Sequence, residues 1–283
     1  MTIKSIYGLF LLSTLLLTCS HIAQQSTAYL RLQGSDTMYL LAQHWSEAYM
    51  KVNPDLSIYV TGGGTAKGFQ ALINGETDIC TASRPMLPHE VRLLAEQYRR
   101  LGVAHMVAKD ALSIYVHPLN PVSDLSISQL REIFTGQTTN WKEVGGLDSP
   151  IRVIIRSPNS GTYLYFKEHV LNNQAYLPTA ITRYSNEAIA QAVFDDPTAI
   201  GYGGTAYGNQ VKHCAVNGIA PTIENVVSDR YFISRYLYLY TLDTPRGLVN
   251  DFIAWIMDKP GQIIVAQTGF IPIFGAMQAN PPH

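Results

Sequence analysis

Residues 154–163, IIRSPNSGTY, join a predicted strand to a predicted helix. The apolar run over 151–155 predicts a largely buried strand, and the segment 163–171 has the apolar side of a helix. Pro158 and Asn159 favour a turn between the two. Such a strand-to-helix junction is typical of α/β proteins, and it is the stretch from which we infer the fold.

The predicted start of this helix offers donors for an anion. Ser160 is a natural N-cap, so Gly161 and Thr162 supply free backbone N–H groups in the first turn. These groups, the hydroxyls and the positive end of the helix dipole favour an anion. Arg156 ends the strand beside them, and its planar fork suits an oxyanion better than a lysine does. An ordinary capped helix without a ligand explains the same residues.

The composition indicates a compact globular protein. The chain has 283 residues, enough for two lobes, with a formal net charge of -1 and 14% charged residues. These values argue against nucleic acid as a partner and against a polybasic membrane patch. Histidines are scattered and no Cys-x-x-Cys pair occurs, so we predict no metal and no other cofactor. Cys80 and Cys214 either form a disulfide or remain unpaired, with Cys80 a small core residue.

Residues 1–26 are predicted to form an export segment and a short N-terminal stretch. Lys4 precedes an apolar run over 6–17, which is too short to span a bilayer but fits the core of a signal peptide. Leu16-Leu17-Thr18-Cys19 has the form of a bacterial lipoprotein box, although Thr18 replaces the usual Gly, Ala or Ser. We therefore expect a protein in the periplasm or on the outer face of the cytoplasmic membrane, with Cys19 as a candidate lipid anchor.

Strand-like runs alternate with helical segments along the chain, which predicts an α/β fold of parallel sheets with helices on both faces. The strand-like runs lie at 29–33, 57–61, 78–82, 111–116, 151–155, 199–203 and 236–241. Later helices are expected at 186–194, 247–257 and 261–267, with Asn186 as the cap of the first of these.

Two other strand-to-helix junctions share the chemistry of the first. They are Ser35-Asp36-Thr37 and Gly62-Gly63-Gly64-Thr65. Each offers hydroxyls, small residues and a helix start, and neither offers a nucleophile with an evident base. In open α/β sheets such junctions gather beyond the carboxyl ends of the strands, where ligands bind. Together the junctions predict an oxyanion held largely by neutral donors.

Catalytic and nucleotide-binding alternatives fit the sequence less well. No G-x-S-x-G elbow is present, which argues against an α/β-hydrolase. The glycine-rich loop at 62–68 lacks the Gly-Lys-Ser/Thr ending of a P-loop, and the dinucleotide-type pattern at 201–206 is also explained by a tight turn. We expect a binding protein and no enzyme, with an exported phosphatase or phosphotransferase as the alternative from another class.

Several motifs occur in a fixed order along the chain. They are Gly34-Ser35-Asp36-Thr37, Gly62-Gly63-Gly64-Thr65, Ala82-Ser83-Arg84-Pro85, Phe134-Thr135-Gly136, Thr139-Asn140-Trp141-Lys142, Arg156 with Ser160-Gly161-Thr162, and Ala199-Ile200-Gly201-Tyr202. In order and separation they resemble those of the phosphate-binding proteins of bacterial ABC-type phosphate importers. The similarity covers nearly the whole chain after the export segment.

The resemblance implies a two-lobed, periplasmic-binding-protein-like fold. Each lobe would be a mostly parallel sheet flanked by helices, with two crossover segments near 108–111 and 228–235. Lobe 1 would comprise 27–108 plus 232–283, and lobe 2 would comprise 109–231. The protein would be a monomer that gives inorganic phosphate to the membrane permease of an ABC importer. Another tetrahedral oxyanion, such as sulfate or a phosphonate, is the alternative ligand.

The resemblance also implies a set of ligand-binding residues drawn from both lobes. They are Ser35, Asp36, Thr37, Met38, Thr65, Ser83, Arg84, Arg156, Ser160, Gly161 and Thr162.

One of these positions departs from the best-known members, which have an aspartate where this chain has Arg84. A carboxylate can accept the proton that bound phosphate retains at neutral pH, whereas it repels sulfate, which carries none. We expect Asp36 to be a relocated acceptor, with Arg84 pairing with it or contacting the anion. Otherwise Asp36 only caps a helix and Arg84 is a surface charge.

Overall fold

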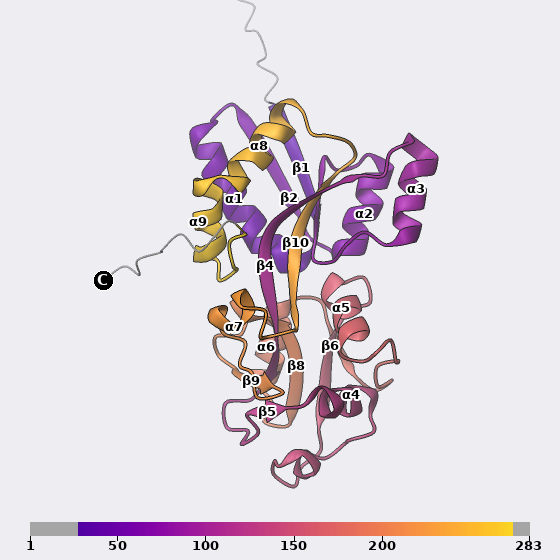
Figure 1. The fold of residues 1–283 in the computed structure, drawn as a ribbon, viewed down its shortest axis with the longest axis vertical. Helices are drawn as coiled ribbons and strands as arrows, with labels where there is room; N and C mark the ends of the chain where they lie inside the picture. Colours follow the sequence, from indigo (N-terminus) through magenta and orange to yellow (C-terminus); the bar gives the residue numbers. More distant parts are fainter. Residues whose placement is uncertain (1–27, 274–283) are drawn as a thin grey trace, which may run out of the picture.

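The computed structural model describes residues 28–273, so the predicted export segment and Cys19 lie outside the described residues. None of the helices in this range is both long enough and apolar enough to cross a membrane. Strands and helices alternate along the chain, which confirms the predicted α/β class (Figure 1).

The strands are β1 (Ala28–Gly34), β2 (Leu56–Thr61), β3 (Ile79–Ala82), β4 (Val103–Val116), β5 (Asp124–Leu125), β6 (Arg152–Arg156), β7 (Ile181–Arg183), β8 (Ala199–Gly204), β9 (Lys212–Val216) and β10 (Ser234–Thr241). The α-helices are α1 (Tyr39–Val52), α2 (Thr65–Asn74), α3 (Pro88–Tyr98), α4 (Ile127–Thr135), α5 (Gly161–His169), α6 (Asn186–Phe194), α7 (Ile223–Val227), α8 (Gly247–Met257) and α9 (Lys259–Gln267). Short 3-10 helices cover Asp36–Met38, Trp141–Val144 and Thr205–Tyr207.

The strands form one mixed sheet in the order β2-β1-β3-β10-β4-β8-β6-β7, with β9 beside β4 and β5 beside β9. β1 pairs in parallel with β2 and β3, and β6 pairs in parallel with β7 and β8. β10 is antiparallel to β3 and β4, and β4 is antiparallel to β8 and β9. Each half of the sheet therefore contains one long strand that is antiparallel to its neighbours: β10 in the first half and β4 in the second.

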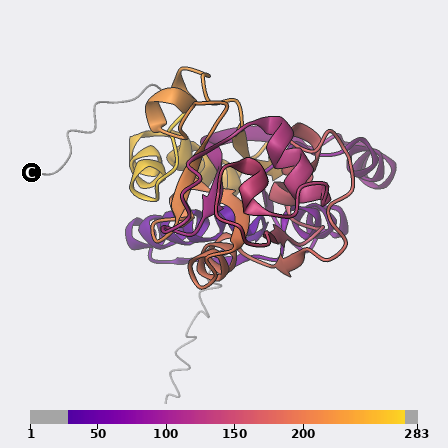
Figure 2. The same ribbon diagram turned by 90° about the horizontal axis from the view of Figure 1, so that it is seen from below.

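Two long strands, β4 and β10, run from one half of the molecule into the other (Figure 1). β4 pairs with β10 from Val103 to Ala111 and with β8 from Leu112 to Val116. We call the half built on β1–β3, α1–α3, α8 and α9 lobe 1, and the half built on β5–β9 and α4–α7 lobe 2. Figure 2, seen from below, shows lobe 2 in front of lobe 1.

Each lobe has its own buried core. In lobe 1, Trp45 of α1 is fully buried, and its indole N–H donates to the Gly261 carbonyl at 2.9 Å, which fixes the C-terminal helices on α1. In lobe 2, the ring of Phe166 stacks on that of Tyr202 at 4.1 Å, and Phe134 packs edge-on against Phe166 at 4.8 Å. Because α5 carries Phe166, this packing fixes the helix whose start faces lobe 1.

The two cysteines among the described residues are both buried and unpaired. Cys80 lies in β3 of lobe 1, and Cys214 lies in β9 of lobe 2. Burial raises the pKa of the Cys214 thiol to about 12, which keeps it protonated. Both therefore act as small core residues, and the disulfide alternative is wrong for this structure.

We expect Phe134→Ala to lower the free energy of unfolding by about 3–5 kcal/mol, because it leaves a cavity in the aromatic core of lobe 2. Urea unfolding followed by circular dichroism measures this change. Phe232→Ala is the matched control, since that ring is 43% exposed and its loss should cost less than about 0.5 kcal/mol. Equal midpoints for the two variants would contradict this description of the core.

Candidate functional site

The three junctions lie together where the two lobes meet. The hydroxyl oxygens of Thr37, in the 3-10 helix after β1, and Thr162, in the first turn of α5, are 3.0 Å apart. On the lobe 1 side, the hydroxyls of Thr65 and Ser83 are 3.2 Å apart. All four residues are buried, so hydroxyls from separate segments form one enclosed polar cluster.

The start of α5 approaches lobe 1 so closely that only glycine fits at position 161. A β-carbon on Gly161 would lie 2.4 Å from the Ser83 hydroxyl oxygen and 2.7 Å from that of Thr65. Ser160 caps the helix as predicted, because its hydroxyl accepts from the Thr162 N–H at 3.1 Å. The backbone at this helix start therefore lies directly against the hydroxyls of the other lobe.

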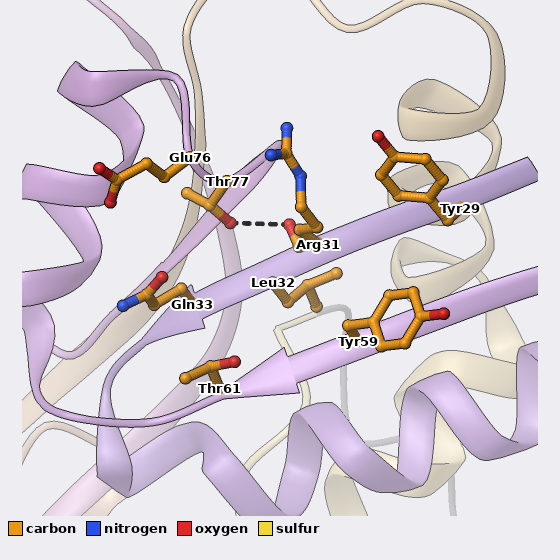
Figure 3. Close-up of a pocket in the computed structure, with 8 residues that line it drawn as sticks. All are labelled: Tyr29, Arg31, Leu32, Gln33, Tyr59, Thr61, Glu76 and Thr77. Atoms are coloured by element: carbon orange, nitrogen blue, oxygen red, sulfur yellow. Dashed lines mark hydrogen bonds between the residues drawn. The ribbon is translucent and has the colours of Figure 1, made fainter.

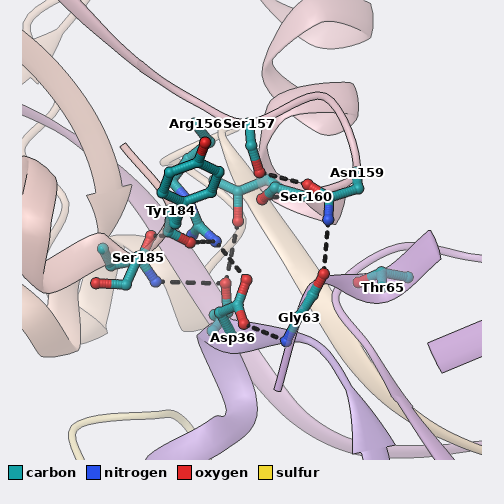
Figure 4. A network of polar contacts seen from close by, with 12 residues as sticks. Asp36, Gly63, Thr65, Arg156, Ser157, Asn159, Ser160, Tyr184 and Ser185 are labelled. Atoms are coloured by element: carbon teal, nitrogen blue, oxygen red, sulfur yellow. Dashed lines mark hydrogen bonds and ion pairs between the residues drawn. The ribbon is translucent and has the colours of Figure 1, made fainter. Parts of the chain in front are cut away.

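The guanidinium of Arg156 is fully buried at the end of β6 (Figure 4). Its Nη1 donates to Asn186 Oδ1 at 2.8 Å, and its Nη2 donates to the Tyr184 carbonyl at 2.8 Å and to Asp36 Oδ2 at 3.0 Å. Nε has no partner among the described atoms. Burial lowers the pKa of Arg156 while Asp36 opposes the shift, and an arginine stays protonated in proteins.

Asp36 joins the first junction both to the second junction and to lobe 2. Its Oδ1 accepts from the Gly63 N–H at 2.7 Å, and its Oδ2 accepts from Arg156. Because both oxygens have protein donors, Asp36 supports Arg156 and the glycine-rich loop. Its side chain makes no helix-capping hydrogen bond among the described contacts, so the capping alternative has no support.

Arg84 does not pair with Asp36, and this part of the prediction is wrong. Its Nη1 and Nη2 contact the two carboxylate oxygens of Glu90 at 2.8 and 2.7 Å, and its guanidinium lies 5.1 Å from the centre of the Phe69 ring. It is only 4% exposed, so the surface-charge alternative is also wrong. The reason is local: Glu90, in the first turn of α3, completes a buried bidentate pair.

Ser35 and Met38 mainly shape the first junction. The Ser35 N–H donates to the Thr81 carbonyl at 2.9 Å, and the Met38 N–H donates to the Ser35 carbonyl at 3.0 Å. The backbone N–H of Met38 therefore already has a protein acceptor. Its side chain is fully buried in the core of lobe 1.

The turn predicted at Pro158 and Asn159 makes a further contact between the lobes (Figure 4). Asn159 Nδ2 donates to the Gly63 carbonyl at 2.6 Å, and the Asn159 carbonyl accepts from the Ala66 N–H at 3.2 Å. The turn thus holds the loop before α2 against the start of α5.

Three residues at the site were not predicted from the sequence: Asn186, Asp110 and Arg235. Ser185 caps α6, so the prediction of Asn186 as the cap is wrong by one residue, and its amide instead donates to the Thr37 hydroxyl at 3.3 Å. Arg235 of β10 donates to Asp110 of β4 and to the Thr162 hydroxyl. Charged residues inside otherwise apolar strands were the signal that could have identified this pair.

The other surface features offer fewer groups that could bind a ligand. A groove beside β1 and β2 is lined by Tyr29, Arg31, Tyr59, Glu76 and Thr77, among others, and no residue of the three junctions is part of its lining (Figure 3). Arg31 there already pairs with Asp78 at 2.9 Å. Within residues 28–273, no three His, Cys, Asp or Glu side chains come together in a way that could hold a metal ion.

Comparison with known proteins gives consistent matches over most of the chain. Residues 21–260 match the family described as a PBP superfamily domain. The phosphate-binding protein PstS of Bacillus subtilis is 30% identical over 257 residues, which are 88% of this chain and 82% of that protein. The PstS of Borreliella burgdorferi is 28% identical, over 95% of this chain and 99% of that protein.

Solved structures give the same result. A substrate-binding protein of Clostridium perfringens, assigned to phosphate ABC transport and solved with phosphate bound, is 29% identical with a TM-score of 0.79, covering 87% of this chain and 99% of that chain. An ABC-type phosphate transport receptor from Vibrio cholerae is 27% identical with a TM-score of 0.72, covering 87% and 100%. The chain therefore belongs to the PBP superfamily and, within it, to the family of the phosphate-binding protein PstS.

Proposed function

We propose that this protein is an exported receptor that captures inorganic phosphate between its lobes and gives it to the permease of an ABC importer. The observation that carries the proposal is the cluster of buried donors from both lobes around Arg156. Relatives that match over most of their length are named as phosphate-binding proteins, and the similar Clostridium perfringens structure holds phosphate.

The chemistry of the cluster suits a tetrahedral oxyanion. An anion cut off from bulk water needs a hydrogen-bond donor for each of its oxygens. The proposed donors are the hydroxyls of Thr37, Thr65, Ser83, Ser160 and Thr162, the backbone N–H of Gly161 at the start of α5, and the guanidinium of Arg156; the Thr162 N–H, predicted to be free, instead donates to Ser160. The partial positive charge at the N-terminus of α5 adds to the attraction.

The proposal includes the division into lobes, the hinge between them and the location of the protein. Lobe 1 comprises 27–108 plus 232–283 and lobe 2 comprises 109–231, each a mostly parallel sheet flanked by helices. The two crossover strands, β4 and β10, act as the hinge, so the lobes close over the anion and open to release it. The protein acts as a monomer in the periplasm or on the outer face of the cytoplasmic membrane, with Cys19 as its lipid anchor.

The ligand contacts proposed from the sequence divide into two groups. Thr37, Thr65, Ser83, Arg156, Ser160, Gly161 and Thr162 remain proposed contacts. Ser35, Asp36 and Met38 support them, and Arg84 is excluded because Glu90 occupies its fork.

An exported phosphatase is the weaker candidate. Its hydroxyl nucleophile would need a neighbouring base. In the described part of the chain, the Thr37 and Thr162 hydroxyls contact each other, Asn186 and Arg235, and no histidine or carboxylate. Binding without turnover fits these contacts better.

Calorimetric titration with phosphate, sulfate and methylphosphonate tests the choice of ligand. We expect phosphate to bind most tightly, because the hydroxyls around the site can accept the proton of monohydrogen phosphate as well as donate. If sulfate or methylphosphonate binds as tightly as phosphate or more tightly, phosphate is not the preferred ligand of this protein.

We expect Arg156→Ala to weaken phosphate binding by roughly two to three orders of magnitude, since it removes a charge-assisted contact to a buried anion. Arg156→Lys should recover only part of the loss, because an ammonium lacks the planar fork. The same titration measures both variants.

Arg152→Ala is the matched control for Arg156, because its side chain, at the other end of β6, is 61% exposed. The control should bind phosphate normally. If Arg156→Ala also binds phosphate normally, or fails to fold without ligand, Arg156 is a structural residue.

We expect Gly161→Ala to weaken phosphate binding by at least roughly tenfold, because the added β-carbon would push the start of α5 away from Ser83 and Thr65. Gly247→Ala is the control: a β-carbon there meets no described atom within 4 Å, and its φ of +54° puts the cost of alanine on folding and not on phosphate binding. Normal affinity in Gly161→Ala would mean that the lobes do not come this close when phosphate is bound.

A further inference from the structure

A buried ion pair links the two strands that join the lobes. Arg235 of β10 is paired in register with Asp110 of β4, and the two residues are 5% and 1% exposed. Nε and Nη2 of Arg235 contact the same carboxylate oxygen, Asp110 Oδ2, at 3.1 and 2.8 Å. Both Arg235 Nη1 and Asp110 Oδ1 are buried and have no hydrogen-bond partner among residues 28–273.

This geometry differs from that of the buried Arg84–Glu90 pair. Arg84 contacts both oxygens of Glu90 with its two Nη atoms, and its Nε is the nitrogen without a partner among the described atoms. Arg235 contacts one oxygen only and keeps Nη1 without an acceptor. Because buried N–H groups are almost always paired in proteins, and because the neighbouring Nη2 of Arg235 already contacts a hydroxyl of the proposed site, Nη1 is placed to take an acceptor from an anion bound there.

Arg235 also reaches the hydroxyls that join the lobes. Its Nη2 donates to the Thr162 hydroxyl oxygen at 2.9 Å and lies 3.5 Å from that of Thr37. Since the Thr162 oxygen accepts from Arg235, its own proton points away from Arg235, toward the Thr37 oxygen at 3.0 Å or toward an anion bound beside it. Arg235 thereby orients a hydroxyl that we assign to the phosphate site.

A cleft beside the site ends at the same side chain. This cleft, of about 410 Å³, is lined by residues of both lobes and of β10, including Arg84, Tyr165, His169, Arg235 and Tyr236. Arg235 is part of its wall and also contacts the buried hydroxyls, so it lies between the cleft and the cluster. The same cleft wall also carries the carboxylate of Glu168, so the guanidinium of Arg235 is the charged group that links the cleft to the Thr162 hydroxyl.

We propose that Arg235 is a second anion-binding arginine, which contacts the phosphate through Nη1 and is held in place by Asp110. The inference rests on the proposed function and adds to it a contact from the strands that join the lobes. Arg156 approaches the anion from β6 of lobe 2, and Arg235 approaches it from the hinge. Closure of the lobes then brings two guanidinium groups to one anion.

The test compares Asp110→Asn, Arg235→Gln and the double variant Asp110→Asn/Arg235→Gln by calorimetric titration with phosphate. The double variant replaces the ion pair by two amides, so no unpaired charge stays buried. We expect it to bind phosphate roughly tenfold to a hundredfold more weakly, as for the loss of one hydrogen bond to a charged group. Asp110→Asn alone keeps the guanidinium but loses the carboxylate that holds it, so its affinity for phosphate should fall between those of the wild type and the double variant.

Two further variants complete the test. Arg230→Gln, at an exposed arginine that pairs with Glu224 just before β10, is the matched control and should bind normally. Arg235→Lys keeps the charge but not the fork, and it should bind more weakly than the wild type even if the double variant fails to fold.

Thermal melting without phosphate separates binding from folding. A double variant, or Arg235→Lys, that melts like the wild type and binds phosphate within roughly threefold of it overturns the assignment of Arg235. If the wild type itself does not bind phosphate, the proposed function is wrong, whatever the variants show.

Discussion

The buried guanidinium of Arg156 is the constraint on which the meeting of the two lobes depends. A charge removed from water must be paired and hydrogen-bonded, or it destabilises the fold. Lobe 2 supplies part of the pairing through Asn186 and the Tyr184 carbonyl, and lobe 1 supplies Asp36. Both Nη atoms have acceptors only when both lobes contribute, so the charge favours the closed arrangement and prepares a cationic centre for an anion.

The fold places neutral donors around this centre with little distortion. Strand ends and helix starts meet between the lobes, where backbone N–H groups and capping hydroxyls already point outward from the elements. Gly161 allows the start of α5 to touch the Ser83 and Thr65 hydroxyls. The two long strands, β4 and β10, carry a second buried ion pair beside the same cluster. The site is therefore made by elements that also hold the lobes together.

The sequence predicted the parts of this arrangement that depend on local chemistry. Alternating apolar runs predicted the α/β class, and Ser160 was identified as an N-cap because serine before a helix start caps it directly. The partners of Arg84 and Arg235 were missed for a different reason. Arg235 meets Asp110 only through the register of two strands far apart in the sequence, and Arg84 turns toward Glu90 because burial requires a complete pair. Such long-range pairing is set by packing rather than by motif.

Closure of the lobes around phosphate is the central claim, and small-angle X-ray scattering tests it most directly. The radius of gyration of the protein would be measured without ligand, with saturating phosphate, and with the same concentration of chloride. The radius should fall with phosphate and stay unchanged with chloride, because a bound phosphate accepts hydrogen bonds from both lobes at once and so favours the closed arrangement. An identical radius with and without saturating phosphate would contradict closure and favour a preformed site.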